Sequence, residues 1–320
     1  MKKMILILIT IFLFLVFFVL LLTFNASNKT GWGKDYFLDI LTDHYLEESG
    51  KIRSYGTKKN TEYLLESNGL YMNWLKSQEL TEEIYKQKQT IYQYFLVEKG
   101  DDAFLAWKLD GNKEANVNAW IDDRRIIEVL GPDDNLTQKI KRSIFKHQIK
   151  DSYISDFYDW ELKVKSSRVI LSYGTNIDIF PQLDMKELYY EISHNDEVFY
   201  PELYDLSSQS FSENKEVHMV DQLLIAIELE QLQLNTDPFW NWLVAEWKEH
   251  NMISGRYNRN TLVGNKIESG AVYGIASLYA TIRNEAFYSQ HWKHRGVDIV
   301  WKPDGNYEDV HFFDLIWNAP

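Results

Sequence analysis

The feature of this 320-residue sequence that most restricts its fold is an alternation between two kinds of predicted helix. Amphipathic segments carry apolar residues every three or four positions and charges opposite, which is typical of surface helices. Between them lie segments that are apolar nearly all round, which is typical of helices buried on every side. The amphipathic segments are 35–49, 81–96, 135–149 and 238–250, and the apolar ones are 168–174, 219–229 and 270–280.

A regular interval accompanies this alternation. Polar residues that begin or mark the predicted inner helices recur about every 50 residues, which is the length of one helical hairpin with its loops. Six hairpins would fill the chain beyond its N-terminal segment. Because no sequence self-similarity accompanies the interval, an open solenoid is disfavoured. We therefore predict an all-α, closed ring of helical hairpins with the apolar helices lining the centre. Short strands are expected only in 102–110 and 163–173.

The N-terminal segment predicts a membrane helix. Residues 4–24 form an uncharged apolar run, and at 1.5 Å per residue they would cover about 31 Å, the thickness of a bilayer core. A secretory signal usually has a shorter apolar run of ~7–15 residues, and "FNASNKT" is a poor cleavage site. Lys2 and Lys3 place the N-terminus in the cytoplasm. We expect an uncleaved signal anchor at 1–25, a linker at 26–34 and one extracellular domain at 35–320.

Composition excludes several classes of function. The formal net charge of −13 argues against a nucleic-acid partner, because phosphate binding requires a basic surface. The absence of cysteine excludes disulfides, thiolate metal sites, thiol catalysis and a lipoprotein anchor. "HWKH" (291–294) has two histidines but no supporting carboxylate motif, so we expect no metal site there. No nucleotide-binding motif is found, and no cofactor is expected.

Glu66 is the first of three acidic residues at predicted starts of inner helices. It lies in "LLESNGLYMNWL" (64–75) and is followed by Ser67, Asn68 and Gly69, which form helices poorly. One interpretation is a first-turn carboxylate that stabilises the helix dipole. The other is a functional group, since Gly69 permits the close approach of a ligand or another backbone.

Asp123 is the second acidic residue at a predicted start of an inner helix. In "NAWIDDRRIIEVLG" (118–131) it shares a helical face with isoleucines, whereas Asp122 points elsewhere. An inward-facing Asp is costly unless it is paired or hydrogen-bonded. The structural alternative to a functional role is an ion pair with Arg124, Arg125 or another base.

Asp221 is the third. "EVHMVDQLLIAIELEQL" (216–232) is apolar from Met219 to Ile227 except for Asp221 and Gln222. A lone buried Asp is either a structural hydrogen-bonding centre or a group that points into a cavity, and the sequence leaves both open.

Carboxylates at the starts of inner helices would converge at one end of a ring. Glycoside hydrolysis requires this arrangement: one carboxyl protonates the leaving oxygen and one carboxylate activates water, without metal or thiol.

At these residues the sequence resembles glycoside hydrolase family 8 in its broad sense. It is most similar to the membrane-anchored, exopolysaccharide-degrading branch found beside Gram-positive exopolysaccharide synthesis genes. The stretches that carry the match together span Leu64 to Ala280, and they are 64–75, 118–131, 216–232 and 254–280. The resemblance implies an (α/α)6 barrel, the same architecture that the spacing predicts.

The resemblance also implies roles for individual residues. Glu66 matches the general acid and Asp221 the general base of an inverting mechanism, which requires room for a water between them. Asp123 matches the aspartate of the central sugar subsite, with Asp122 beside it. Arg256 and Tyr257, in "GRYN", match cleft residues that bind substrate or orient water.

Two departures from the better-known cellulases and chitosanases of the family affect these assignments. The chain has Ile121-Asp122-Asp123 where they have Asp-Gly-Asp or Asp-Ala-Asp, and Val220-Asp221-Gln222 where they have Tyr-Asp-Ala. The substrate therefore need not be cellulose or chitosan. Asp205, in "ELYDLSS", is the alternative base, and Glu268 is a further candidate cleft residue.

The sequence thus predicts a membrane-anchored, extracellular endo-glycosidase that cleaves a β-linked exopolysaccharide. Its expected partners are the polysaccharide, the membrane and the exopolysaccharide synthesis machinery, but no nucleic acid. Because a fold does not determine a function, the alternative is a non-catalytic polysaccharide-binding or synthase-associated protein on the same scaffold. A lyase on a similar helical ring is a third possibility, although the Tyr/His or Arg pair it would use is not evident.

Overall fold

The computed structural model describes residues 32–56, 62–175, 177–194, 197–212 and 214–320. The chain divides into two compact units, one of residues 1–41 with 320 and one of residues 42–319. The described part of the first unit contains helix α2 (Lys34–Ile40). The predicted signal anchor at 1–25 lies outside the described residues. Within them, no helix has the length and apolarity needed to cross a membrane.

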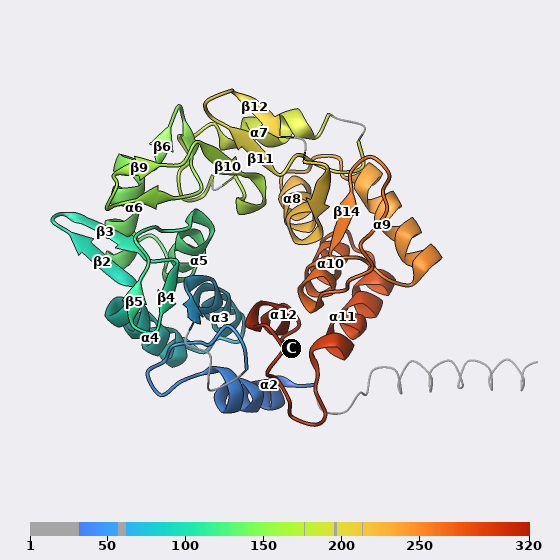
Figure 1. Ribbon diagram of the computed structural model, residues 1–320, viewed down its shortest axis with the longest axis horizontal. Helices are drawn as coiled ribbons and strands as arrows, with labels where there is room; N and C mark the ends of the chain where they lie inside the picture. Colours follow the sequence, from blue (N-terminus) through green and yellow to red (C-terminus); the bar gives the residue numbers. More distant parts are fainter. Residues whose placement is uncertain (1–31, 57–61, 176, 195–196, 213) are drawn as a thin grey trace, which may run out of the picture. The chain divides into compact units, whose positions relative to one another are not determined.

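The second unit is a ring of inner and outer helices (Figure 1). The inner elements are α3 (Leu65–Ser77), α5 (Trp120–Leu130), the 3-10 helix η3 (Leu171–Tyr173), α8 (Met219–Gln231), α10 (Gly270–Ile282) and α12 (Phe312–Ile316). The outer helices are α4 (Thr81–Thr90), α6 (Asn135–His147), α7 (Met185–Ile192), α9 (Asp237–His250) and α11 (Ala286–Val300). Two π-helical turns, η1 (Leu41–Tyr45) and η2 (Ile91–Phe95), complete the helical content. Inner and outer helices alternate along the chain, as the sequence predicts.

Burial explains which helices are inner. Helix α10 is buried over most of its length, including Ala271, Ile275 and Ala276, so it has no polar face to present to water. Small residues also allow close packing, because a Cβ added to Gly274 would come within 2.4 Å of the Trp317 carbonyl oxygen. The amphipathic α6 buries only one side, with Leu136, Ile140 and Ile144 inward, and therefore lies outside.

Short antiparallel strands connect many of these helices, so the all-α class describes the fold only in part. The strands are β1 (Glu62–Leu64), β2 (Leu96–Lys99), β3 (Asp102–Leu105), β4 (Lys108–Asp110), β5 (Lys113–Glu114), β6 (Ile149–Lys150), β7 (Tyr153–Ile154), β8 (Tyr158–Asp159), β9 (Val164–Lys165), β10 (Arg168–Ile170), β11 (Leu203–Asp205), β12 (Ser210–Ser212), β13 (Glu216–His218) and β14 (Arg256–Asn258). They form the small sheets β1-β4-β5, β10-β11-β12, β2-β3, β6-β7, β8-β9 and β13-β14. These long connections satisfy backbone hydrogen bonds by pairing with one another.

Strands were expected in 102–110 and 163–173, and both segments contain them. The buried helix predicted at 168–174 is wrong. Val169 and Ile170 are β-branched and lie in β10, and the one turn of η3 ends at Gly174, whose φ of 81° is typical of glycine.

Three strands lead directly into inner elements. β1 ends at Leu64 and α3 begins at Leu65. β10 and η3 are likewise continuous, as are β13 and α8. A paired strand fixes the direction in which the chain enters the helix, so the side chains of the first helical turn are held in defined positions.

Candidate active site

The N-terminal turns of five inner elements line one cavity of about 330 Å³. Its lining residues come from α3, α5, η3, the β13–α8 junction and the start of α12, and they are Glu66, Ile121, Arg125, Ser172, Tyr173, His218, Val220, Asp221, Leu224, His311 and Phe313. The structure therefore brings Glu66 and Asp221 together from distant parts of the sequence. Helix N-termini carry partial positive charge, which favours carboxylates in this position.

Glu66 lies in the first turn of α3 with its side chain 29% exposed. Its Oε1 lies 3.2 Å from Nη1 of Arg125, and the same nitrogen lies 3.2 Å from Oδ1 of Asp122. Among the described residues, no hydrogen bond reaches the second carboxylate oxygen of Glu66. Arg125 thus bridges one cavity-lining carboxylate and one buried carboxylate.

The poor helix formers after Glu66 have structural roles. Asn68 is fully buried, donates to the Leu64 carbonyl oxygen at 2.9 Å and accepts from Gln87. Gly69 faces Arg125, because a Cβ added to Gly69 would lie 3.0 Å from the Arg125 Cβ. These residues allow α3 and α5 to approach closely enough for Arg125 to reach Glu66.

Asp122 is almost completely buried, and its environment favours the protonated form. Burial, and after it the charge of Glu66, raises the pKa of Asp122 from 3.8 to about 8, while Arg125 opposes the shift. Two carboxyl groups that share one arginine repel each other when both are ionised. Asp122 is therefore mostly protonated near neutral pH.

Asp221 lies in the first turn of α8 with its side chain 30% exposed. The Ser172 hydroxyl donates to Oδ1 at 2.6 Å, and Nδ1 of His218 lies 3.2 Å from Oδ2. Of the two roles that the sequence left open, a group that points into a cavity describes Asp221 better, although it is also hydrogen-bonded.

A hydrogen-bonded clamp holds the start of α8. The buried amide of Gln222 donates to the Tyr200 carbonyl oxygen at 2.9 Å and accepts from the Tyr200 N–H at 2.8 Å. The Glu202 carboxylate accepts from the His218 N–H at 2.6 Å and from the Gln222 amide at 3.1 Å. Gln222, one of the departures from the family pattern, thus anchors the helix that carries Asp221.

Tyr173 contributes a neutral hydroxyl to the cavity. Burial raises the pKa of its phenol, and the surrounding carboxylates Asp122, Asp156, Asp221 and Glu66 raise it further. The phenol stays protonated at neutral pH and can donate a hydrogen bond. Tyr173 was not predicted as a site residue.

Asp123 lies outside the cavity wall, contrary to its predicted contact with a sugar. It is 1% exposed, and Asn118 donates to its Oδ2 at 2.5 Å while also donating to Gln148 at 2.8 Å. Burial raises the pKa of Asp123. The ion pair considered as its structural alternative is also wrong, because Arg124 pairs with Glu128 and Arg125 with Glu66. Asp122, not Asp123, faces the Glu66 side.

Tyr257 is a core residue, so its predicted place in the cleft is wrong. It is 1% exposed, and its hydroxyl donates to Glu246 at 3.1 Å and accepts from the Ser254 N–H at 2.7 Å. Arg256 faces the opposite side of β14, pairs across the sheet with His218 and forms an ion pair with Glu216 at 3.1 Å. Arg256 is therefore a neighbour of a lining residue but does not itself line the cavity.

The remaining candidates have structural partners. Asp205 accepts the backbone N–H groups of Ser207 and Ser208, each at 2.8 Å, and these bonds lower the pKa of Asp205. That arrangement makes it a turn-capping residue and a weaker base candidate than Asp221. Glu268 forms an ion pair with Arg295, which lowers the pKa of Glu268 below its usual value.

No group of three or more metal-binding side chains is found in the described parts of the chain. Within "HWKH", His291 contacts the Phe287 carbonyl oxygen at 2.8 Å.

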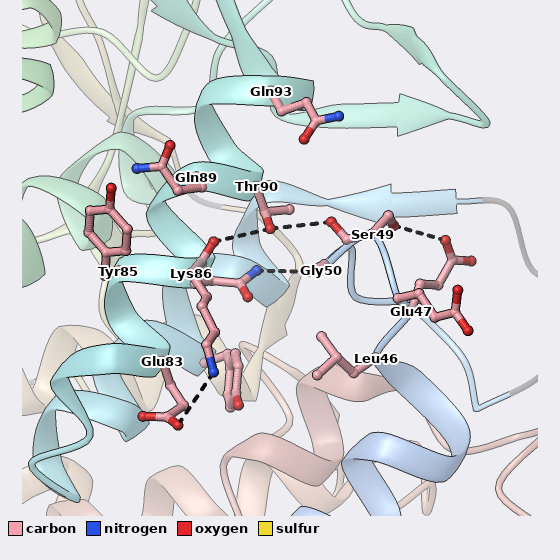
Figure 2. A pocket seen from close by; sticks show the side chains of 13 residues that line it. Leu46, Glu47, Ser49, Gly50, Glu83, Tyr85, Lys86, Gln89, Thr90 and Gln93 are labelled. Atoms are coloured by element: carbon pink, nitrogen blue, oxygen red, sulfur yellow. Dashed lines mark hydrogen bonds and ion pairs between the residues drawn. The ribbon is translucent and has the colours of Figure 1, made fainter.

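A second cavity of about 460 Å³ lies between α4 and the loop around Ser49 (Figure 2). Two of its charged lining residues are in ion pairs: Lys86 with Glu83 at 4.0 Å, and Glu47 with Arg53 at 3.0 Å. None of the predicted site residues lines it. The cavity of Glu66 and Asp221 is therefore the candidate site.

His218, Ser172 and Arg125 were not predicted as site residues. Arg125 was considered only as a partner of Asp123. His218 and Ser172 lie in "EVHMVDQ" and "RVILSYG", segments that the sequence marked for their apolar character. A polar side chain in a segment predicted to be mostly buried was the feature that could have identified them as site residues.

Comparison with known proteins gives one curated relative, the putative lipoprotein YdaJ from Bacillus subtilis strain 168. It is 26% identical over 245 residues, covering 70% of this chain and 66% of that protein. The match thus spans just under two thirds of the relative's length. No protein-family model matches the chain.

Solved structures share the fold over most of the chain. PssZ from Listeria monocytogenes is 27% identical with a TM-score of 0.74, over 88% of this chain and 92% of that one. An α-amylase from Clostridium perfringens is 16% identical with a TM-score of 0.78, over 91% and 97%. Endoglucanase Cel10 from Klebsiella pneumoniae, a family 8 glycosyl hydrolase, is 11% identical with a TM-score of 0.60, over 88% and 96%. The resemblance to the PssZ and YdaJ type, and to the family 8 fold, is confirmed.

Proposed function

We propose that this protein is a glycoside hydrolase that cleaves a β-linked polysaccharide by an inverting mechanism. Glu66 is the proposed general acid and Asp221 the proposed general base. The observation that carries the proposal is their position on the first turns of α3 and α8, lining one cavity. The confirmed family 8-like fold supports the same reaction class.

The proposed reaction is a single displacement. Glu66 donates a proton to the glycosidic oxygen while the bond from that oxygen to the anomeric carbon breaks. A water molecule attacks the opposite face of that carbon, and Asp221 accepts the proton that the water loses. One carbon–oxygen bond breaks, one forms, and each carboxyl group exchanges one proton.

The Glu66–Arg125–Asp122 arrangement supports the acid role. Because Arg125 contacts both carboxyl groups, it keeps its contact with Asp122 when Glu66 is protonated. A protonated Glu66 would therefore not leave the buried guanidinium without a partner. The phenol of Tyr173 lines the same cavity and can donate to a sugar hydroxyl.

We place this activity outside the cell, with residues 1–25 as a signal anchor and exopolysaccharide as substrate. The apolar run at 4–24 supports the anchor, and the curated relative is named a lipoprotein. Tethering would hold the enzyme where new polysaccharide leaves the membrane. Its proposed partners are therefore that polymer and the machinery that synthesises it.

A non-catalytic polysaccharide-binding protein is the second candidate. Two observations favour it. Both carboxylate oxygens of Asp221 already have side-chain partners, and Arg125 contacts Glu66. In a binding protein, such contacts would be permanent and no bond would be cleaved.

Reducing-end release tests the proposal. Residues 32–320 are incubated with β-glucan, xylan, chitosan, poly-β-1,6-N-acetylglucosamine and soluble starch. We expect the wild type to release reducing ends from a β-linked polymer, and Glu66→Gln to lose activity by ~10²–10⁴-fold, since that is the usual contribution of a general acid. Asp205→Asn is the matched control and should keep its activity. Binding without new reducing ends would favour the second candidate, and cleavage of starch alone would overturn the β-linkage.

A further inference from the structure

We propose that His218 makes the base Asp221 sensitive to pH. The neutral imidazole leaves Asp221 able to accept the proton of the attacking water, whereas the imidazolium holds the same carboxylate in an ion pair. This inference rests on the proposed function of Asp221 and adds a positioning residue to it.

The contact geometry links the two side chains directly. His218 ends β13, and its Nδ1 lies 3.2 Å from Oδ2 of Asp221, in the first turn of α8. Ser172 occupies the other oxygen of Asp221, so Oδ2 is the oxygen whose state His218 determines. The His218 side chain is 38% exposed, which allows its ring to exchange protons with solvent.

The position of His218 is fixed by its backbone. Its N–H donates to the buried Glu202 carboxylate at 2.6 Å, and its strand pairs with β14 through Val217 and Tyr257. The backbone of His218 is therefore held beside the first turn of α8. Gln222, the residue after Asp221, donates to Glu202, so the same carboxylate contacts both the strand of His218 and the helix of Asp221.

Charged groups of both signs surround the imidazole. Asp221 contacts the ring of His218, and Glu202 contacts its backbone N–H. Arg256 is its cross-strand neighbour but is paired with Glu216.

The remaining titratable groups line the cavity or contact its lining residues. These are the Glu66–Arg125–Asp122 cluster, the neutral phenol of Tyr173, and His311, whose Nδ1 accepts the Phe313 N–H at 3.1 Å. Asp221 is thus the carboxylate that the imidazole contacts most directly.

The direction of the effect follows from charge. An imidazolium next to Asp221 stabilises the carboxylate and weakens it as a base. Imidazoles change charge between pH 5 and 8, so the rate should rise as pH increases through that range. The acidic limb of the pH profile would then depend on the presence of His218.

The first test is the pH dependence of reducing-end release from β-glucan or xylan, whichever the wild type cleaves faster. The wild-type rate should rise with pH between pH 5 and 8, the range in which imidazoles change charge, because the neutral ring leaves Asp221 a stronger base. His218→Asn keeps an amide near the Nδ1 position but cannot titrate, so its acidic limb should move down by about one pH unit or more. An unchanged limb would overturn the inference.

His250→Asn is the matched control. His250 is also exposed and lies near a carboxylate, with its Nε2 3.7 Å from Glu246, but it does not line the cavity. Its profile should match the wild type. If the wild type cleaves and Glu66→Gln does not, an unaltered His218→Asn profile refutes this inference while the proposed function stands.

The second test does not need activity. In ¹⁵N-histidine NMR spectra, the Asp221 contact should favour the Nδ1–H tautomer of neutral His218. Asp221→Ala should shift the ring towards the usual Nε2–H tautomer, and Asp205→Ala should not. A tautomer unaffected by Asp221→Ala would overturn the inference, whether or not any polymer is cleaved.

Discussion

Arg125 is the residue on which the proposed acid depends. Its side chain is 8% exposed and contacts Glu66, at 29%, and Asp122, at 4%. Without this cation, Asp122 would lie in a low-dielectric interior with no positive partner. Arg125 therefore bears on both the stability of the fold and the proposed acid role of Glu66.

Arg125→Met should destabilise the protein. It keeps an apolar stem but removes the guanidinium that contacts both Glu66 and Asp122. Because Asp122 is mostly protonated near neutral pH, the expected loss is that of hydrogen bonds to a charged group, about 1.5–3 kcal/mol. Urea unfolding measures the change. The double variant Arg125→Met/Asp122→Asn should recover part of the loss at alkaline pH, where an ionised Asp122 would lack a partner cation. A loss below about 1 kcal/mol in the single variant would contradict the bridging role.

Asp122→Asn should change how stability depends on pH. The folded protein raises the pKa of Asp122 from 3.8 to about 8, so between these values the folded state binds more protons than the unfolded state. The stability that Asp122 contributes is present below pH ~4 and is lost as pH rises towards ~8. The free energy of unfolding of the wild type, relative to Asp122→Asn, should fall across this window. A constant difference would contradict the assignment.

At the scale of elements, a strand followed at once by a helix recurs at the site. The α3 and α8 starts were predictable, because "LLESNGLYMNWL" and "EVHMVDQLLIAIELEQL" combine an apolar helix with one early carboxylate. Which of Asp122 and Asp123 lies near Glu66 was not predictable. It depends on Asn118, which donates to Asp123 and also to Gln148 at the C-terminal end of α6, and this tertiary contact leaves no local pattern.

The close approach of α10 and α12 gives a prediction at this scale. In Gly274→Ala the new Cβ would come within 2.4 Å of the Trp317 carbonyl oxygen, so the helices must separate. We expect a loss of ~1–3 kcal/mol in urea unfolding, typical of overpacking. Gly255→Ala is the control, because its nearest new contact, at 3.4 Å, is an ordinary one. Equal effects of the two substitutions would contradict the packing argument.

At the scale of the molecule, the ring turns distant sequence positions into neighbours. The alternation of amphipathic and apolar helices predicted the ring, and the ring places the first turns of α3, η3 and α8 around one cavity (Figure 1). The roles of Arg256 and Tyr257 were less accessible to sequence, because adjacent residues of β14 face opposite sides. Only the pairing with β13 shows that Tyr257 points into the core.

The anomeric configuration of the first product tests the central claim most directly. If Glu66 and Asp221 act from opposite sides of one glycosidic bond with a water between them, the new reducing end must have the configuration opposite to that of the cleaved linkage. ¹H NMR spectra recorded in the first minutes of cleavage, before the anomers equilibrate, distinguish the two outcomes. Inversion is the result we predict. A product that retains the configuration would require a nucleophile attached to the protein and would contradict the mechanism.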